Sequence, residues 1–87
     1  MREPINLSEI EKAMSDVRVF LENKIKEKGN LSFASIHEIS GVLDEEFDEL
    51  KESIHLNDYN QVEIELKDVI ISAFWGLVSL QTRKIDW

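Results

Sequence analysis

Residues 61–81 read Gln-Val-Glu-Ile-Glu-Leu-Lys-Asp-Val-Ile-Ile-Ser-Ala-Phe-Trp-Gly-Leu-Val-Ser-Leu-Gln, and this stretch decides the fold. Apolar residues recur in it every three or four positions, which is the spacing of one face of an α-helix. The predicted core stripe consists of Val62, Leu66, Val69, Ile70, Ala73, Leu77 and Leu80. Much of the opposite side is also apolar, through Ile64, Ile71, Phe74, Trp75 and Val78. A helix that is apolar on most sides must be covered on most sides, so we expect a second copy of the protein to meet this second set.

A first amphipathic helix is expected over residues 7–28. Its apolar positions keep the same helical spacing, and its start carries two alternative capping boxes, Ser8 with Glu11 and Asn6 with Glu9. Lysines followed by a glycine mark its end, because cations favour the carboxyl end of a helix and glycine ends it.

A second helix is expected over residues 36–55, where Ser35 and Glu38 form another capping box. Turn and cap residues at 57–60 then lead into the third helix. The predicted fold is therefore all-α, a three-helix antiparallel protomer that forms one domain over residues 1–87 and completes a helical bundle by oligomerisation.

Composition narrows the class of protein further. With 18 acidic and 10 basic residues the formal net charge is −8, which has the wrong sign for binding nucleic-acid polymers or anionic membranes. The absence of cysteine excludes disulfides, thiolate zinc sites and thiol catalysis. No apolar run is long enough to cross a membrane or to act as a signal peptide, so we expect a soluble, cytoplasmic protein.

Two pairs of carboxylates stand out on the second and third helices. Glu46 and Glu49 lie one turn apart, as do Glu65 and Asp68, and each pair points to one side of its helix. A short turn makes the two helices antiparallel, which brings the pairs to the same height. Four converging carboxylates repel one another unless a cation lies between them, and oxygen ligands suit Mg²⁺ or Mn²⁺. In the alternative interpretation the acids only form the solvated faces of amphipathic helices.

Residues 45–49, Glu-Glu-Phe-Asp-Glu, are followed after 15 residues by residues 65–68, Glu-Leu-Lys-Asp. This E-E-x-x-E…E-x-x-D pattern resembles the metal-binding signature of the MazG-like all-α nucleoside triphosphate pyrophosphohydrolases. The resemblance implies a helical homodimer or homotetramer that uses Mg²⁺ to convert a nucleoside triphosphate to the monophosphate and pyrophosphate. It implies metal ligands at Glu46, Glu49, Glu65 and Asp68, and a catalytic role for Glu45 in orienting a ligand or the attacking water.

Substrate-binding candidates lie outside the acidic motif. Phe33 precedes the second helix and His37 lies in its first turn, and both are expected to border a nucleotide pocket. In the alternative interpretation Phe33 only caps the hydrophobic core and His37 is an ordinary surface residue. Arg83 and Lys84 are the cations that follow the third helix and are the candidates for contacting phosphates. A rival function remains open, in which the chain is a non-catalytic helical interaction protein and its acids form a solvating face.

Overall fold

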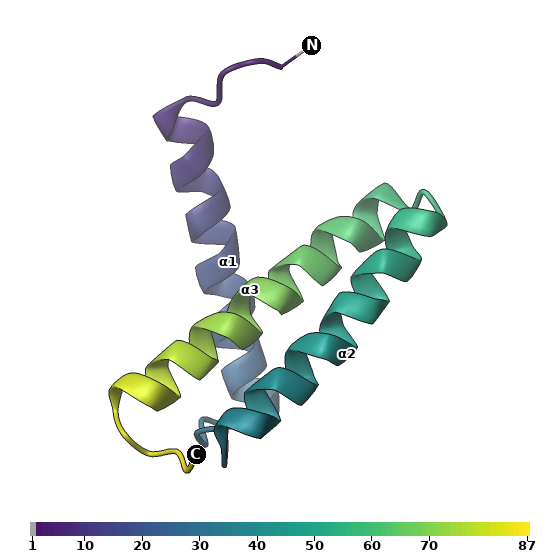
Figure 1. The fold of residues 1–87 in the computed structure, drawn as a ribbon. Helices are drawn as coiled ribbons and strands as arrows, with labels where there is room; N and C mark the ends of the chain where they lie inside the picture. The colour runs from purple at the N-terminus through teal and green to yellow at the C-terminus, as the bar shows by residue number, and fades with distance from the viewer. Residues whose placement is uncertain (1) are drawn as a thin grey trace. The chain divides into compact units, whose positions relative to one another are not determined.

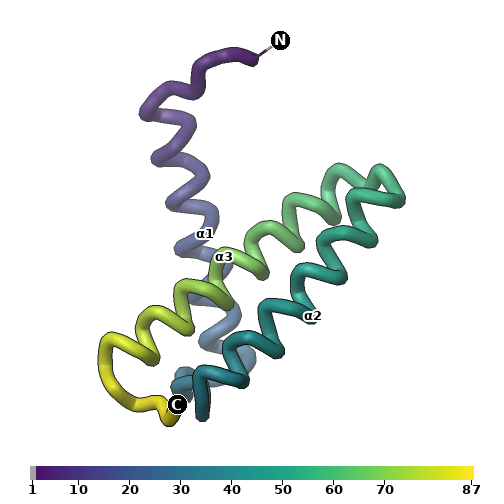
Figure 2. Tube along the Cα trace, viewed as in Figure 1, coloured from purple at the N-terminus to yellow at the C-terminus, as the bar shows by residue number. Residues whose placement is uncertain are grey.

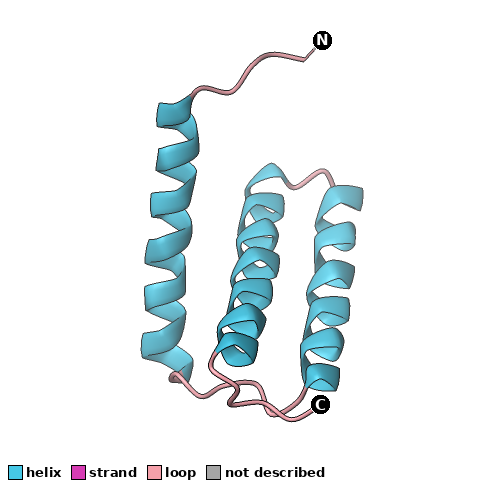
Figure 3. Cartoon of the chain, turned by 60° about the vertical axis from the view of Figure 1, so that its left-hand side comes forward, coloured by secondary structure: helices cyan, strands magenta, loops and turns pink. Residues whose placement is uncertain are grey.

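The computed structural model describes residues 2–87 and contains three helices. They are α1 (Leu7–Lys28), α2 (Ile36–His55) and α3 (Tyr59–Gln81), and the described chain contains no β-strand (Figure 3). The predicted all-α class with three helices is confirmed. The first two helices have the predicted bounds, whereas α3 begins at Tyr59, inside the stretch 57–60 that was predicted to be turn and cap, because Asp58 caps the helix. None of the helices in this part of the chain is both long and apolar enough to span a membrane.

The chain divides into two compact units at Asn30. The first contains α1, whose Asn6 side chain accepts a hydrogen bond from the Glu9 backbone N–H while the Glu9 carboxylate accepts one from the Asn6 backbone N–H. Of the two expected capping boxes, the helix therefore uses the one at Asn6. Gly29 ends the helix at a φ of 86°, a left-handed conformation that glycine adopts without strain.

The second unit, Leu31–Trp87, is built on α2 and α3. Ser35 caps α2 by accepting from the Glu38 N–H, but the Glu38 carboxylate accepts from Ala34 instead of completing the box. Asp58 caps α3 by accepting from the Gln61 N–H. The three residues between the helices, 56–58, turn the chain back, and α2 and α3 run antiparallel as a helical hairpin (Figures 1 and 2).

The face of α3 that packs on α2 overlaps the predicted core stripe only in part, through half-buried Val62 and Val69. Gly76 is buried against Ile39, and a Cβ atom built on Gly76 would lie 3.1 Å from the Ile39 Cγ2 atom. Glu65 and Ser79, on the same side of α3 as Gly76, are also buried. Leu66 and Leu77 of the predicted stripe remain 45% and 48% exposed. The prediction was wrong for Leu66 and Leu77 because it ranked faces by hydrophobicity, whereas the two helices approach each other through the small side of α3 at Gly76.

The second apolar set of α3 was expected to meet another copy, and part of it is used within the chain instead. Ile71 is buried. The Trp75 indole Nε1–H donates a hydrogen bond to the Leu31 carbonyl oxygen at 2.8 Å, and the Phe33 amide donates to the Ser79 hydroxyl at 3.1 Å. These bonds fix the connector that precedes α2 against the last turns of α3.

The carboxyl-terminal residues close the same end of the hairpin. Ile36 donates its amide to the Asp86 carbonyl, and Asp86 donates its amide to the Ala34 carbonyl. The Ser32 hydroxyl donates to the Lys84 carbonyl at 2.8 Å. The connector and the tail are thus paired by backbone hydrogen bonds.

Candidate metal centre

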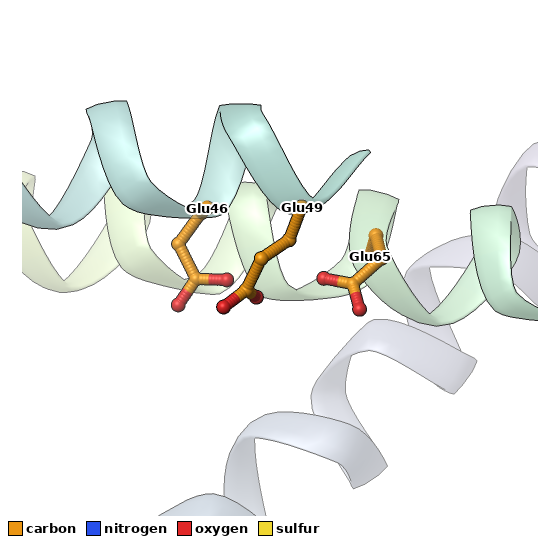
Figure 4. A group of neighbouring side chains, drawn as sticks. All are labelled: Glu46, Glu49 and Glu65. Atoms are coloured by element: carbon orange, nitrogen blue, oxygen red, sulfur yellow. The ribbon is translucent and has the colours of Figure 1, made fainter. Parts of the chain in front are cut away.

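Three glutamates gather on one side of the hairpin. Glu46 and Glu49 extend from successive turns of α2, and Glu65 extends toward them from α3 (Figure 4). One carboxylate oxygen from each residue lies within 4.8 Å of those from the other two. The i, i+3 spacing on α2 and the antiparallel packing of α3 produce this meeting.

Glu65 is the buried member of the group, with 8% of its surface exposed. Its Oε1 accepts a 2.7 Å hydrogen bond from Nε2 of Gln61, one turn earlier on α3. Its Oε2 is buried and has no hydrogen-bond partner. A buried carboxylate oxygen without a partner is energetically costly, so this atom is suited to a ligand that brings positive charge.

The neighbouring carboxylates change the pKa of Glu49. The pKa of Glu49 is raised from the ordinary value of 4.5, first by partial desolvation and then by the charge of Glu65, whose carboxylate could accept a hydrogen bond from the protonated form of Glu49. The charges of Glu45 and Asp68 raise the pKa further. Because Glu49 as a whole is exposed, water screens part of this repulsion. The Glu49 carboxyl group therefore binds a proton more readily than an isolated glutamate does.

Asp68 and Glu45 lie around the three glutamates. Asp68 is half-buried one turn after Glu65, and its charge acts on Glu49, but it does not belong to the group of three. Glu45 is exposed and also acts on Glu49 through its charge.

The four candidate substrate residues lie at the end of the hairpin formed by the connector and the residues after α3, whereas Glu46 and Glu49 lie near the middle of α2. Phe33 is half-buried in the connector, and His37 is exposed in the first turn of α2, about 14 Å along the helix from Glu46. Arg83 is exposed at a φ of 57° and donates to the Leu80 carbonyl, and Lys84 is exposed beside it.

Gln61 is a site residue that the sequence reasoning did not identify. It orients the Glu65 carboxylate by holding Oε1, which leaves Oε2 as the atom without a partner. The signal was present in the sequence, because a Gln and a Glu four residues apart on a helix can form a side-chain hydrogen bond.

The residues fit a hard divalent cation. Mg²⁺ and Mn²⁺ prefer carboxylate oxygens, and this group offers three carboxylates from two helices. One of them, Glu65, has a buried oxygen atom without a hydrogen-bond partner. The described chain holds no other group of three or more acidic or histidine side chains placed to share an ion.

Comparison of the chain with protein-family models, with curated proteins and with solved structures gave no match in any of the three.

Proposed function

We propose that this protein is a nucleoside triphosphate pyrophosphohydrolase that uses Mg²⁺, or Mn²⁺ in its place. Glu46, Glu49 and Glu65 would hold the metal. The observation that supports the proposal best is the buried Glu65 Oε2 atom, which has no hydrogen-bond partner and belongs to a group of three carboxylates within 4.8 Å. The similarity of residues 45–68 to the MazG-like signature supplies the reaction class.

In this reaction the oxygen of a water molecule bonds to the α-phosphorus, the bond to the bridging oxygen of the β-phosphate breaks, and pyrophosphate leaves. When bound, Mg²⁺ would neutralise the triphosphate and hold it in position. Gln61 fixes the Glu65 carboxylate, which reduces the freedom that a ligand would otherwise have to lose. Glu45, exposed beside the group, is the carboxylate available to orient the attacking water or accept its proton.

The candidate substrate residues suggest where the nucleotide would lie. Its triphosphate would sit at the glutamates, and the rest of the molecule would extend along α2 toward Phe33 and His37. Arg83 and Lys84 belong to the same end of the hairpin, where the backbone pairing of connector and tail holds them.

The test is a pyrophosphate-release assay over ribo- and deoxyribonucleoside triphosphates, with Mg²⁺ and with EDTA. We expect release from at least one nucleotide in Mg²⁺, none in EDTA, and loss of release in Glu65→Gln. Glu52→Gln, an exposed acid of α2 outside the group, is the matched control and should keep full activity. No release from any nucleotide at high protein concentration would refute the hydrolase.

Thermal melts separate the hydrolase from the rival interaction protein. Mg²⁺ should raise the melting temperature if the glutamates bind it, since a ligand that binds only the folded state stabilises that state. A solvating acidic face predicts no such rise. Asp68→Asn tests the fourth predicted ligand. If Mg²⁺ raises the melting temperature of this variant as much as that of the wild type, Asp68 is not a ligand.

A further inference from the structure

The Gln61 side chain makes the two oxygen atoms of the Glu65 carboxylate unlike each other. Its Nε2–H donates to Glu65 Oε1 at 2.7 Å, which is short for a hydrogen bond from nitrogen. Glu65 Oε2 is buried and accepts no hydrogen bond, and within residues 2–87 no other buried side-chain polar atom lacks a partner. The protein therefore holds one oxygen of the carboxylate and leaves the other for a ligand.

The start of α3 fixes the position of this donor. Gln61 is half-buried in the first turn of the helix, and its backbone N–H donates to the Asp58 side chain at 3.1 Å. Side chains of an α-helix lean toward its amino-terminal end, which directs Glu65 back to the residue four positions earlier. Donor and acceptor thus belong to one helix, and the difference between the two oxygens does not depend on the packing of any other element.

This difference determines how Glu65 can bind a cation. A carboxylate coordinates a metal ion through one oxygen or through both. Oε1 already shares its electron density with the Gln61 N–H, so it is the weaker metal ligand of the two. Coordination through Oε2 alone keeps that hydrogen bond and also satisfies the buried atom that lacks a partner. One-oxygen coordination is therefore the favoured mode for Glu65.

One-oxygen coordination does not suit all divalent cations equally. Ca²⁺ takes about six to eight oxygen ligands and is commonly bound by a carboxylate through both of its oxygens. Mg²⁺ takes about six, keeps several of its waters, and needs only a few carboxylates. Glu65 points toward Glu46 and Glu49, and the three residues bring together one oxygen each (Figure 4). Three such oxygens with added water suit Mg²⁺, whereas Ca²⁺ would lack the second oxygen of Glu65.

We propose that Gln61 sets the cation preference of the metal centre, by restricting Glu65 to one-oxygen coordination and so favouring Mg²⁺ over Ca²⁺. Gln61 acts through Glu65, so it is a positioning residue. It lies in the 15-residue spacer between residues 45–49 and 65–68 and is not part of the acidic motif. The inference rests on the proposed function, because it requires a cation at the three glutamates.

Thermal melts of the full chain test the inference. A series of Mg²⁺ concentrations and a series of Ca²⁺ concentrations give a dissociation constant for each ion, because each stabilises the folded state as it binds. The wild type should bind Mg²⁺ more tightly than Ca²⁺. Glu65→Gln should abolish the response to both ions, which assigns the binding to this site.

Gln61→Met is the informative variant, because it keeps the length of the side chain and removes the donor. Its Mg²⁺ dissociation constant should rise about 10–100-fold, the usual effect of removing a group that orients a metal ligand. Its Ca²⁺ dissociation constant should rise less, because Oε1 becomes available as a second ligand. The ratio of the Ca²⁺ to the Mg²⁺ dissociation constant should therefore fall at least about tenfold. Gln81→Met, at the exposed end of α3, is the matched control and should keep the wild-type ratio.

The possible results separate this inference from the proposed function. If Gln61→Met weakens both ions equally, the residue has only a structural role and the inference fails, while Mg²⁺ binding by the wild type still supports the hydrolase. Wild-type protein that binds Ca²⁺ at least as tightly as Mg²⁺ also overturns the inference, and this comparison needs no variant to fold. Gln61→Ala replaces Gln61→Met if circular dichroism shows that the latter is not helical. If neither ion binds the wild type, or if Glu65→Gln keeps wild-type affinity for Mg²⁺, the inference and the proposed metal site fail together.

Discussion

Replacement of Glu65 by Gln should stabilise the metal-free protein and remove its response to Mg²⁺. The substitution keeps the shape of the side chain and the hydrogen bond that Oε1 accepts from Gln61 at 2.7 Å. It replaces the unpartnered, buried Oε2 with an amide N–H₂ that can donate to neighbouring carboxylates. Relief of a buried unsatisfied acceptor is worth about 1–2 kcal/mol of unfolding free energy.

Thermal melts in EDTA and in Mg²⁺ measure both effects. For a domain of this size, about 1–2 kcal/mol corresponds to a rise in melting temperature of about 5–10 °C in EDTA. In Mg²⁺ at 100 times its dissociation constant, the wild type should gain about 2.7 kcal/mol and Glu65→Gln almost nothing. Glu52→Gln should change unfolding free energy by less than about 0.5 kcal/mol and should keep the wild-type Mg²⁺ response.

Two results would refute this reasoning separately. A lower melting temperature of Glu65→Gln in EDTA would mean that the Glu65 carboxylate is satisfied in the folded protein and contributes to its stability. An equal Mg²⁺ response in wild type and Glu65→Gln would mean that the ion binds elsewhere or only to exposed acids. The first result concerns the energetics of the cluster, and the second concerns the metal site itself.

Three further predictions test the site and the packing. Because the folded-state pKa of Glu49 is raised above 4.5, the folded protein binds more protons than the unfolded one as pH rises through that range, so metal-free stability should fall with increasing pH there. Melts in EDTA from acidic to neutral pH should show a smaller fall in Glu49→Gln than in wild type. Gly76→Ala should lower the free energy of unfolding by about 1–2 kcal/mol, because its Cβ atom would lie 3.1 Å from Ile39 Cγ2. Gly41→Ala should raise the free energy of unfolding by about 0.5–1 kcal/mol, because a Cβ atom there has no neighbour within 4 Å and alanine favours the helix. Urea unfolding measures both. Ser79→Ala should cost about 1–3 kcal/mol in the same assay, because it leaves a connector amide without its acceptor, and a cost near zero would show that water replaces the hydroxyl.

The local sequence was sufficient to predict the helices. Their ends are fixed by short-range chemistry, such as the Asn6 and Ser35 caps and the glycine at 29, which needs no knowledge of the rest of the fold. The pairing of carboxylates could also be predicted, because a helical turn and a short antiparallel connection determine which side chains reach the same height. Glu46, Glu49 and Glu65 meet as that geometry requires.

The environment of each carboxylate could not be predicted in the same way. Whether Glu65 is buried depends on the angle and separation at which α3 packs on α2, and these depend on many side chains of both helices. The packing also decides that Gln61 donates its hydrogen bond to Glu65 Oε1, because the Gln61 amide could instead have bonded to water. Asp68 has the same sequence signal as the three glutamates, but it is not a member of the group whose carboxylate oxygens lie within 4.8 Å of one another.

By itself, the sequence determined the three helices, most of their ends, and the placement of the clustered acids on the second and third helices, because hydrogen bonds and side-chain spacing within one helix are local. Only the tertiary structure decided which face of α3 is inside. Hydrophobicity favoured the stripe through Leu66 and Leu77, yet α3 meets Ile39 of α2 at Gly76, and the buried Ser79 binds the connector. Small side chains let two backbones approach closely, and the larger apolar side chains are left on the surface.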